Sequence, residues 1–201
     1  MINHIDAFNI IFGPHGGRLD LDAQPNVLEY QVLRERLQSA PLLVAALRQR
    51  PEWSKVPDIY IDIVNNKMIN AGARFDPQTG CAYIGIWSGA ILCIEDLFSR
   101  ICSRPDFATE IGDCRAEAIQ SFHANGIIRE YEVSERLRAR ADLATTSPKD
   151  PLRRLMARAL SQLAFDYLIR HEIAHIAWGH SGFLRDHGAD GCIEFDYCQA
   201  A

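Results

Sequence analysis

One stretch near the carboxyl end of this 201-residue chain constrains the fold most. Asp150 is a favourable N-cap residue and Pro151 suits the first position of a helix, so a helix is expected to begin there. Neither glycine nor proline occurs again before Gly179, and the helical pattern runs unbroken over that distance. The chain is therefore predicted to contain one long helix, with residues 171–178 on its last turns.

The segments before this helix predict a small sheet and further helices. Apolar residues alternate over 57–64, and we expect a strand there with Ile59, Ile61 and Ile63 on one face. Further strands are expected at 68–75 and 81–87, and helices over 26–50 (two, meeting near Pro41), after the N-cap Ser88 and near 107–124, while 126–145 is ambiguous. These elements predict a single α+β domain over residues 1–201, mainly helical with a small antiparallel sheet.

Composition limits the classes of function. Apolar residues make up 48% of the chain and charged residues 23%, as in an ordinary globular domain. The formal net charge of −5 argues against a dedicated nucleic-acid-binding protein, which would carry a basic face. The densest run of arginines, from Arg129 to Arg140, is interleaved with glutamates and indicates a solvated helix face. No nucleic-acid partner is expected.

The chain carries no sign of a membrane or an oxidising compartment. It does not open on a signal peptide, and no apolar run approaches the ~20 residues needed to cross a bilayer. Its six cysteines form no CxxC pair and no tight framework. We therefore expect reduced thiols in a cytoplasmic protein with no membrane partner.

The sequence HEIAHIAWGH at residues 171–180 contains candidate metal ligands and a candidate catalytic base. His171 and His175 are four residues apart on a helix, so both project from one face and can bind one metal ion. Glu172 is turned by about 100° from His171, which places its carboxylate beside the metal rather than on it. Zinc lowers the pKa of a water that it binds toward ~7, and Glu172 is expected to take a proton as that water attacks a carbonyl. Two histidines brought together by composition alone are the alternative, which the apolar setting disfavours.

Catalytic zinc usually has three protein ligands, so a third is needed. Eighteen residues separate Glu194 from His175, enough for a loop and a second helix that faces the first. His180 would have to turn back at Gly179 alone, and we expect it to cap or orient the helix end. Ligands from the intervening loop remain open alternatives: Asp186, His187 and Asp190.

HEIAHIAWGH followed by IEFDYCQAA resembles the gluzincin metallopeptidases. In their pattern, HExxH precedes a helix with the motif ExxADxxA, and the match assigns Glu194 as the third zinc ligand. Tyr197 and Cys198 stand where the motif has alanine and aspartate, so the aspartate that usually supports a ligating histidine is missing. The resemblance implies a zincin-like fold, bound Zn²⁺ and peptidase activity with Glu172 as the catalytic base. The chain ends seven residues after Glu194, which implies a truncated or unusually short final helix.

NAGARF, a turn and YIGIWSGAI resemble the strand pair and helix that precede the motif in heat-shock and CAAX-type endopeptidases. With no membrane span, the soluble phage-exclusion, Lit-like peptidases are the closer analogy. In such enzymes the corresponding strand binds substrate backbone by strand addition, which implies these substrate-binding residues: Tyr83, Ile84, Gly85 and Ile86. An ordinary core or edge strand is the open alternative.

Two functions follow from these observations. The first is a zinc-dependent endopeptidase that hydrolyses a protein or peptide substrate. The second is a metallopeptidase-like regulatory or toxin-type protein of a mobile element or phage-defence system, acting through a protein partner. The intact motif residues His171, Glu172 and His175 favour the first. Neither the identity of the substrate nor the oligomeric state is predicted.

Overall fold

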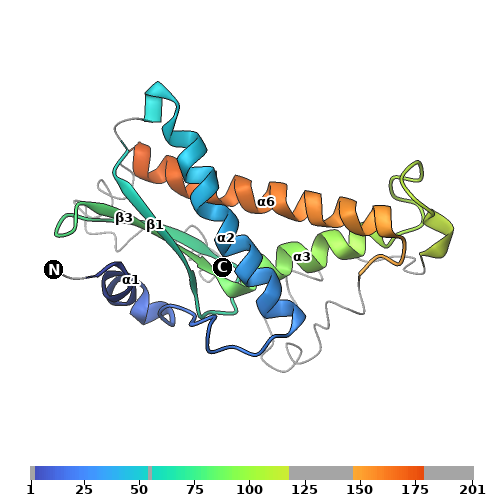
Figure 1. Ribbon diagram of the computed structural model, residues 1–201, viewed down its shortest axis with the longest axis horizontal. Coiled ribbons are helices and arrows are strands. Elements are labelled where there is room, and N and C mark those ends of the chain that lie inside the picture. The colour runs from blue at the N-terminus through green and yellow to red at the C-terminus, as the bar shows by residue number, and fades with distance from the viewer. Residues whose placement is uncertain (1–2, 54–55, 118–146, 179–201) are drawn as a thin grey trace, which may run out of the picture.

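The computed structural model describes residues 3–53, 56–117 and 147–178, and these form an α+β fold (Figure 1). Within them lie four α-helices: α1 (His4–Phe12), α2 (Leu28–Arg48), α3 (Ser88–Cys102) and α6 (Pro151–Ala177). The strands are β1 (Asp58–Val64), β2 (Ala71–Asp76) and β3 (Cys81–Trp87), and short 3₁₀ turns occur at Gly13–His15, Pro51–Trp53 and Cys114–Ala116. None of the described helices has an apolar stretch long enough to cross a membrane.

The sheet is mixed, with the strand order β1–β3–β2. A turn closed by the bond from Gly80 N–H to the Asp76 carbonyl joins β2 to β3, which therefore pair antiparallel. The chain between Val64 and Ala71 leads to β2, which does not pair with β1. Strand β3 then lies between β1 and β2, and it runs parallel to β1. The prediction of an antiparallel sheet is therefore wrong for one of the two pairings.

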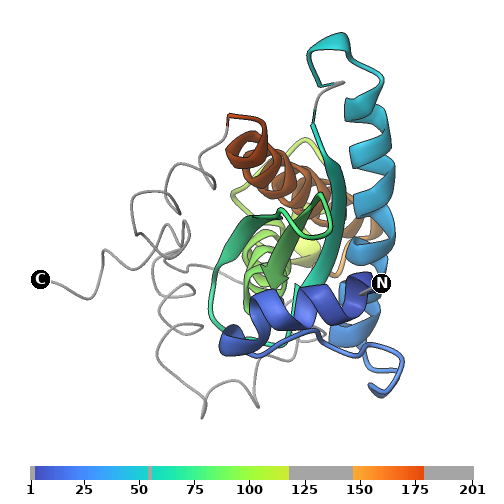
Figure 2. The same cartoon turned by 90° about the vertical axis from the view of Figure 1, so that its left-hand side faces the viewer.

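Helices cover both faces of this sheet. Figure 2 shows α6 and α1 on opposite sides of the strands. One core lies between the sheet and helices α2, α3 and α6, and it includes Ile63, Ile84, Ile86, Ile91, Phe165, Ile169 and Ile173. A second, smaller core lies under α1 and includes Phe8, Phe12, Val64, Tyr83 and Trp87. The alternating residues of β3 thus pack into different cores, and the whole strand is buried.

The N-terminal part of the chain differs from prediction at two places. Residues 28–48 form one helix rather than two, because Pro41 lies on its exposed face while Ala40, Leu43 and Val44 pack into the core on either side. Pro41 has no backbone N–H, so one carbonyl of the preceding turn lacks its helical hydrogen bond. On the exposed face this carbonyl can bond to water instead. Helix α1 was not predicted, although Asn3 caps it by accepting a hydrogen bond from Asp6 N–H at 2.8 Å.

Two predictions in the middle of the chain are also corrected. Ser88 is the first residue of α3 rather than its N-cap, and its hydroxyl donates to the Asn66 carbonyl at 2.8 Å. Over 107–117 the described chain holds only a 3₁₀ turn, so the predicted helix is absent there. The rest of that prediction, 118–124, and the ambiguous segment 126–145 lie outside the described residues.

A buried arginine fixes the start of α6. The Arg153 side chain is 1% exposed, and its five N–H groups donate to the carbonyls of the chain that follows α3: Cys102, Arg104, Phe107, Ala108 and Ile111. The Glu117 carboxylate lies 3.9 Å from Arg153 Nε and is equally buried. It also accepts hydrogen bonds from the backbone N–H groups of Lys149 and Asp150, where α6 begins. The ion pair thus joins the α3 end to the α6 start.

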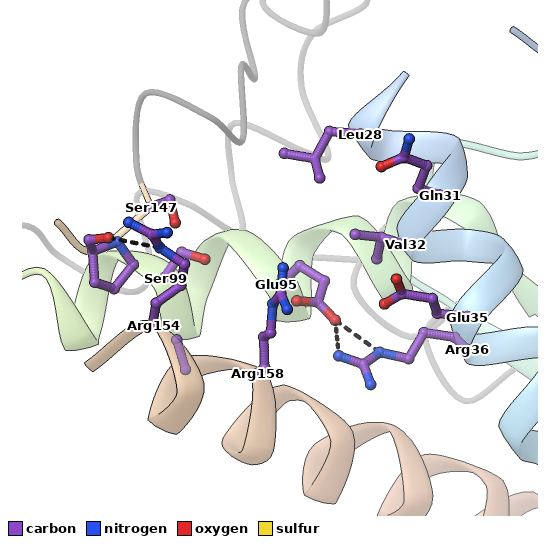
Figure 3. A pocket seen from close by; sticks show the side chains of 12 residues that line it. Leu28, Gln31, Val32, Glu35, Arg36, Glu95, Ser99, Ser147, Arg154 and Arg158 are labelled. Atoms are coloured by element: carbon purple, nitrogen blue, oxygen red, sulfur yellow. Dashed lines mark hydrogen bonds and ion pairs between the residues drawn. The ribbon is translucent and has the colours of Figure 1, made fainter. Parts of the chain in front are cut away.

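A second buried ion pair joins helices α2, α3 and α6 near their middles. Arg36 of α2 donates to the Glu95 carboxylate of α3, and to the amide oxygen of Gln162 on α6. Figure 3 shows Arg36 against Glu95 at the wall of a small pocket between these helices. Arg158 also lines this pocket. His171 lies thirteen positions after Arg158 on the same helix, which is about 20 Å along the helix axis. The pocket is therefore remote from the histidine motif.

We predict that Arg153→Met lowers the free energy of unfolding by about 3–5 kcal/mol, because it removes five hydrogen bonds and leaves Glu117 buried without its cation. Arg153→Lys should cost less, since it keeps the charge, but an ammonium supplies only three donors. The measurement is urea unfolding. Arg158→Met, an exposed change on the same helix, is the control and should stay within about 0.5 kcal/mol of the wild type. Equal effects of Arg153→Met and Arg158→Met would contradict the role of this arginine.

Candidate metal centre

Helix α6 begins and runs as the sequence predicts. Asp150 is its N-cap, and the Asp150 carboxylate accepts from the N–H groups of Leu152 and Arg153 at 2.9 and 3.0 Å. The pKa of Asp150 is held below its usual range. The largest cause is a hydrogen bond from the Asp113 backbone, and the bonds from Arg153 and Leu152 add to it. The helix continues to Ala177, so His171, Glu172 and His175 all lie on its last two turns.

The two histidines of the motif converge at their outer nitrogens. His171 Nε2 and His175 Nε2 lie 3.0 Å apart. The rings meet edge to face, with centroids 4.6 Å apart and planes at 85°. Both side chains are half-buried. One face of the helix thus presents two imidazole nitrogens at a single point, as the four-residue spacing predicts.

This separation fits two ligands of one zinc ion. Zinc bound tetrahedrally by nitrogens at ~2.0–2.1 Å separates those nitrogens by about 3.3 Å. The observed 3.0 Å is close to that value, so a small rotation of either ring suffices. Imidazole nitrogens are also donors that zinc favours. A zinc ion bound here would therefore take two of its three protein ligands from the described residues.

Glu172 lies on the side of α6 that faces the core. Its exposure is only 5%, and its helical neighbours Ile169, Ile173 and Ile176 are all buried. Carboxylates are rarely buried to this extent without a partner or a chemical task, because desolvation of the charge is costly. The position is therefore not that of a solvated surface residue.

Tyr167 is a neighbour of the site that the sequence reasoning missed. Its ring lies against His171 with centroids 6.4 Å apart, and its side chain is 71% exposed. The spacing of four residues before His171 was the available signal, since such pairs meet on a helix surface. The Tyr167 ring thus lies beside the His171 imidazole on the surface of α6.

The third ligand falls outside the described part of the chain. Glu194 and His180 both lie beyond residue 178, as do the alternatives Asp186, His187 and Asp190 and the motif departures Tyr197 and Cys198. Within residues 3–178, apart from the gaps, no group of three His, Cys, Asp or Glu side chains is placed to hold a metal ion. The assignment of Glu194 stays a prediction.

The predicted substrate-binding strand has no free edge. Residues 83–86 lie in β3, which pairs with β1 on one side and with β2 on the other. Tyr83, Ile84 and Ile86 are each no more than 1% exposed, and a Cβ at Gly85 would meet Phe12 at 2.8 Å. A substrate strand cannot add to a strand whose hydrogen-bonding groups are already paired. The prediction that these four residues bind substrate by strand addition is therefore wrong.

Comparisons with family models, with curated protein sequences and with solved structures give no match for this chain.

We predict that His171→Ala or His175→Ala weakens zinc binding by more than about 100-fold, because loss of a ligand costs more than the 10–100-fold typical of a supporting residue. Zinc affinity is measured by competition with a chromophoric chelator. Arg170→Ala, an exposed change on the same turn of α6, is the control for loosening of the helix end and should bind as the wild type does. Full zinc affinity in either histidine variant would rule out this site.

Proposed function

We propose that this protein is a zinc-dependent endopeptidase that hydrolyses peptide bonds of a protein substrate. The observation that supports it best is the convergence of His171 Nε2 and His175 Nε2 to 3.0 Å, with the buried Glu172 on the adjacent face of the same helix. The sequence motif by itself gives only the types of the site residues, two histidines and a glutamate. The convergence of the two rings and the burial of Glu172 support the proposal.

Zinc, when bound, supplies a Lewis acid that makes water nucleophilic at neutral pH. The imidazoles of His171 and His175 would hold the ion, and Tyr167 would help to orient the first of them. Glu172 acts as general base: its carboxylate takes a proton from the attacking water and returns one to the leaving amine. Its burial excludes bulk water from that carboxylate, which raises the strength of its interactions in the site.

The outer edge of β2 is the better candidate for substrate backbone. Helix α6 packs against β2, and Ala71 and Ala73 belong to the core that contains Ile173. The bond from Trp87 N–H to the Asn70 carbonyl sets the ladder, so that Ala73 and Phe75 direct their N–H and C=O groups away from β3. No described residue bonds these groups. We propose that an extended substrate pairs there, beside the motif helix.

The free thiols of the described cysteines are consistent with a reducing compartment. Cys81, Cys93, Cys102 and Cys114 are all free, and the first three are buried. Cys192 and Cys198 lie outside the described residues. Thiols kept free in this way are usual in proteins of reducing compartments, and we propose a cytoplasmic location.

We predict that Glu172→Gln binds zinc as tightly as the wild type but cleaves about 10²–10⁴-fold more slowly, because only the proton acceptor is removed. Zinc content is measured by elemental analysis, and turnover with a library of quenched fluorescent peptides. Asp166→Asn changes another carboxylate of the same helix and should leave turnover unchanged. Zinc binding without any cleavage by the wild type would favour the regulatory or toxin-type alternative. Cleavage by Glu172→Gln at the wild-type rate would exclude the mechanism.

The third ligand has its own test. We expect Glu194→Ala to weaken zinc binding strongly, whereas His180→Ala should change it little, because Glu194 follows a loop long enough to return to α6. Chelator competition on the two variants measures the difference. The opposite result, with zinc lost only from His180→Ala, would indicate a three-histidine site.

A further inference from the structure

Within the part of the chain that the structure describes, the outer edge of β1 is hydrogen-bonded over only part of its length. Leu19 N–H donates to the Ile63 carbonyl, and Asn65 N–H donates to the Gly17 carbonyl, each at 2.8 Å. Main-chain groups of successive strand residues point to opposite sides. Ile59 and Ile61 therefore direct their N–H and C=O groups outward too, in line with Ile63.

Both ends of this unpaired stretch are closed by side chains. At one end, the Asp62 carboxylate accepts a hydrogen bond from Ile63 N–H at 2.8 Å. At the other end, Arg48 Nη2 donates to the Pro57 carbonyl at 2.7 Å. Between them, no described residue bonds the N–H and C=O groups of Ile59 and Ile61. Four main-chain groups in a row are thus left without a partner among the described residues, with defined limits.

A groove of about 440 Å³ runs along this stretch of β1. Its volume is typical of ligand-binding clefts. Helix α2, which runs beside β1 in Figure 1, forms an apolar wall from Pro41, Val44 and Ala45. The other wall consists of His4, Tyr60 and Cys81. The unpaired edge therefore lies in a recess between two walls rather than on a flat surface.

The aromatic wall is held in place by its own contacts. The His4 ring stacks on Tyr60 with centroids 5.5 Å apart, and His4 Nδ1 lies 3.2 Å from the Tyr83 hydroxyl. Tyr60 donates to the Asp62 carboxylate at 2.8 Å, and Arg18 pairs with the same carboxylate at 2.6 Å. Burial, followed by the bond to Asp62, raises the pKa of Tyr60 to about 12, so its hydroxyl stays a donor at neutral pH. A wall fixed in advance loses little entropy when a ligand binds.

We propose that this groove binds an extended, uncharged peptide segment of a partner protein, about five residues long, which adds to the sheet beside β1. The N–H and C=O groups of Ile59 and Ile61, which no described residue bonds, would pair with the peptide backbone. Small apolar side chains suit the α2 wall. Charged ones gain little, because Arg48 is already paired with Asp58 at 2.7 Å. This site does not depend on the proposed peptidase activity, since β1 and β2 are opposite edges of the sheet.

A second copy of the chain is a poorer occupant than an isolated peptide. In each copy the unpaired edge of β1 lies between the α2 wall and the aromatic wall. Two such recessed edges cannot approach to the ~4.8 Å spacing of paired strands without collision of their walls. A single extended segment meets no such obstacle.

The test uses the peptide acetyl-Ser-Val-Thr-Val-Ser-amide and the full chain carrying Glu172→Gln, so that the peptide is not cut. We expect the peptide to slow amide hydrogen exchange at Ile59 and Ile61, measured by NMR. Ala45→Trp fills the groove from α2 and should weaken binding by at least about tenfold, since the main-chain bonds are lost. Ala46→Trp is the matched control, because Ala46 is equally exposed but does not line the groove, and it should bind normally.

Three results would overturn this inference. The first is no binding, or equal binding by the Ala45→Trp and Ala46→Trp variants. The second is protection at Ala73 and Phe75 instead, which would place the peptide on β2. The third is a dimer, detected by sedimentation, that Ala45→Trp dissociates, which would make a second copy the occupant. Loss of zinc or of peptidase activity would affect none of these readouts.

Discussion

Five carbonyl oxygens around one buried guanidinium hold the start of the longest helix of this protein against the rest of the domain. Arg153 is the third residue of α6, and it cannot be buried unless all five N–H groups find acceptors. The chain after α3 supplies them, and this requires a compact loop in which Ala108 takes a positive φ of 46°. Such a conformation is unfavourable for alanine by itself, and the bonds to Arg153 offset its cost. The ends of α3 and α6 are therefore fixed together.

Because α6 is one continuous helix, fixing its start at Arg153 also fixes the position of its last turns, which hold the histidine motif. His171 lies eighteen positions after Arg153, a distance of about 27 Å along the helix axis. Between them, the contact of Arg36 with Glu95 and Gln162 joins α6 to two other helices. The burial of Phe165, Ile169 and Ile173 sets the rotation of α6 about its axis. That rotation turns Glu172 inward and leaves the two histidines at the boundary of the core.

The order of the strands decides which parts of the sheet can bind another chain. The alternation over 57–64 and the turn before Cys81 predict the strands, because side-chain periodicity and turn chemistry are local properties. Neither property says which strand lies in the middle. With β3 between β1 and β2, its backbone is paired on both sides. The groups that no described residue bonds lie at Ala73 and Phe75 on one edge and at Ile59 and Ile61 on the other. The prediction that a substrate strand adds to residues 83–86 was wrong for this reason.

The sequence by itself determined the long helix, its Asp150 and Pro151 start, and the shared face of His171 and His175, because a helix of 3.6 residues per turn fixes these relations. It also predicted the three strands of the described sheet and the helical segment over 28–48. Only the tertiary structure decided that Pro41 is tolerated within one helix, that Glu172 is buried and that β1 and β3 run parallel. Each of these depends on which surfaces meet across distant parts of the chain, and local pattern carries no information about that.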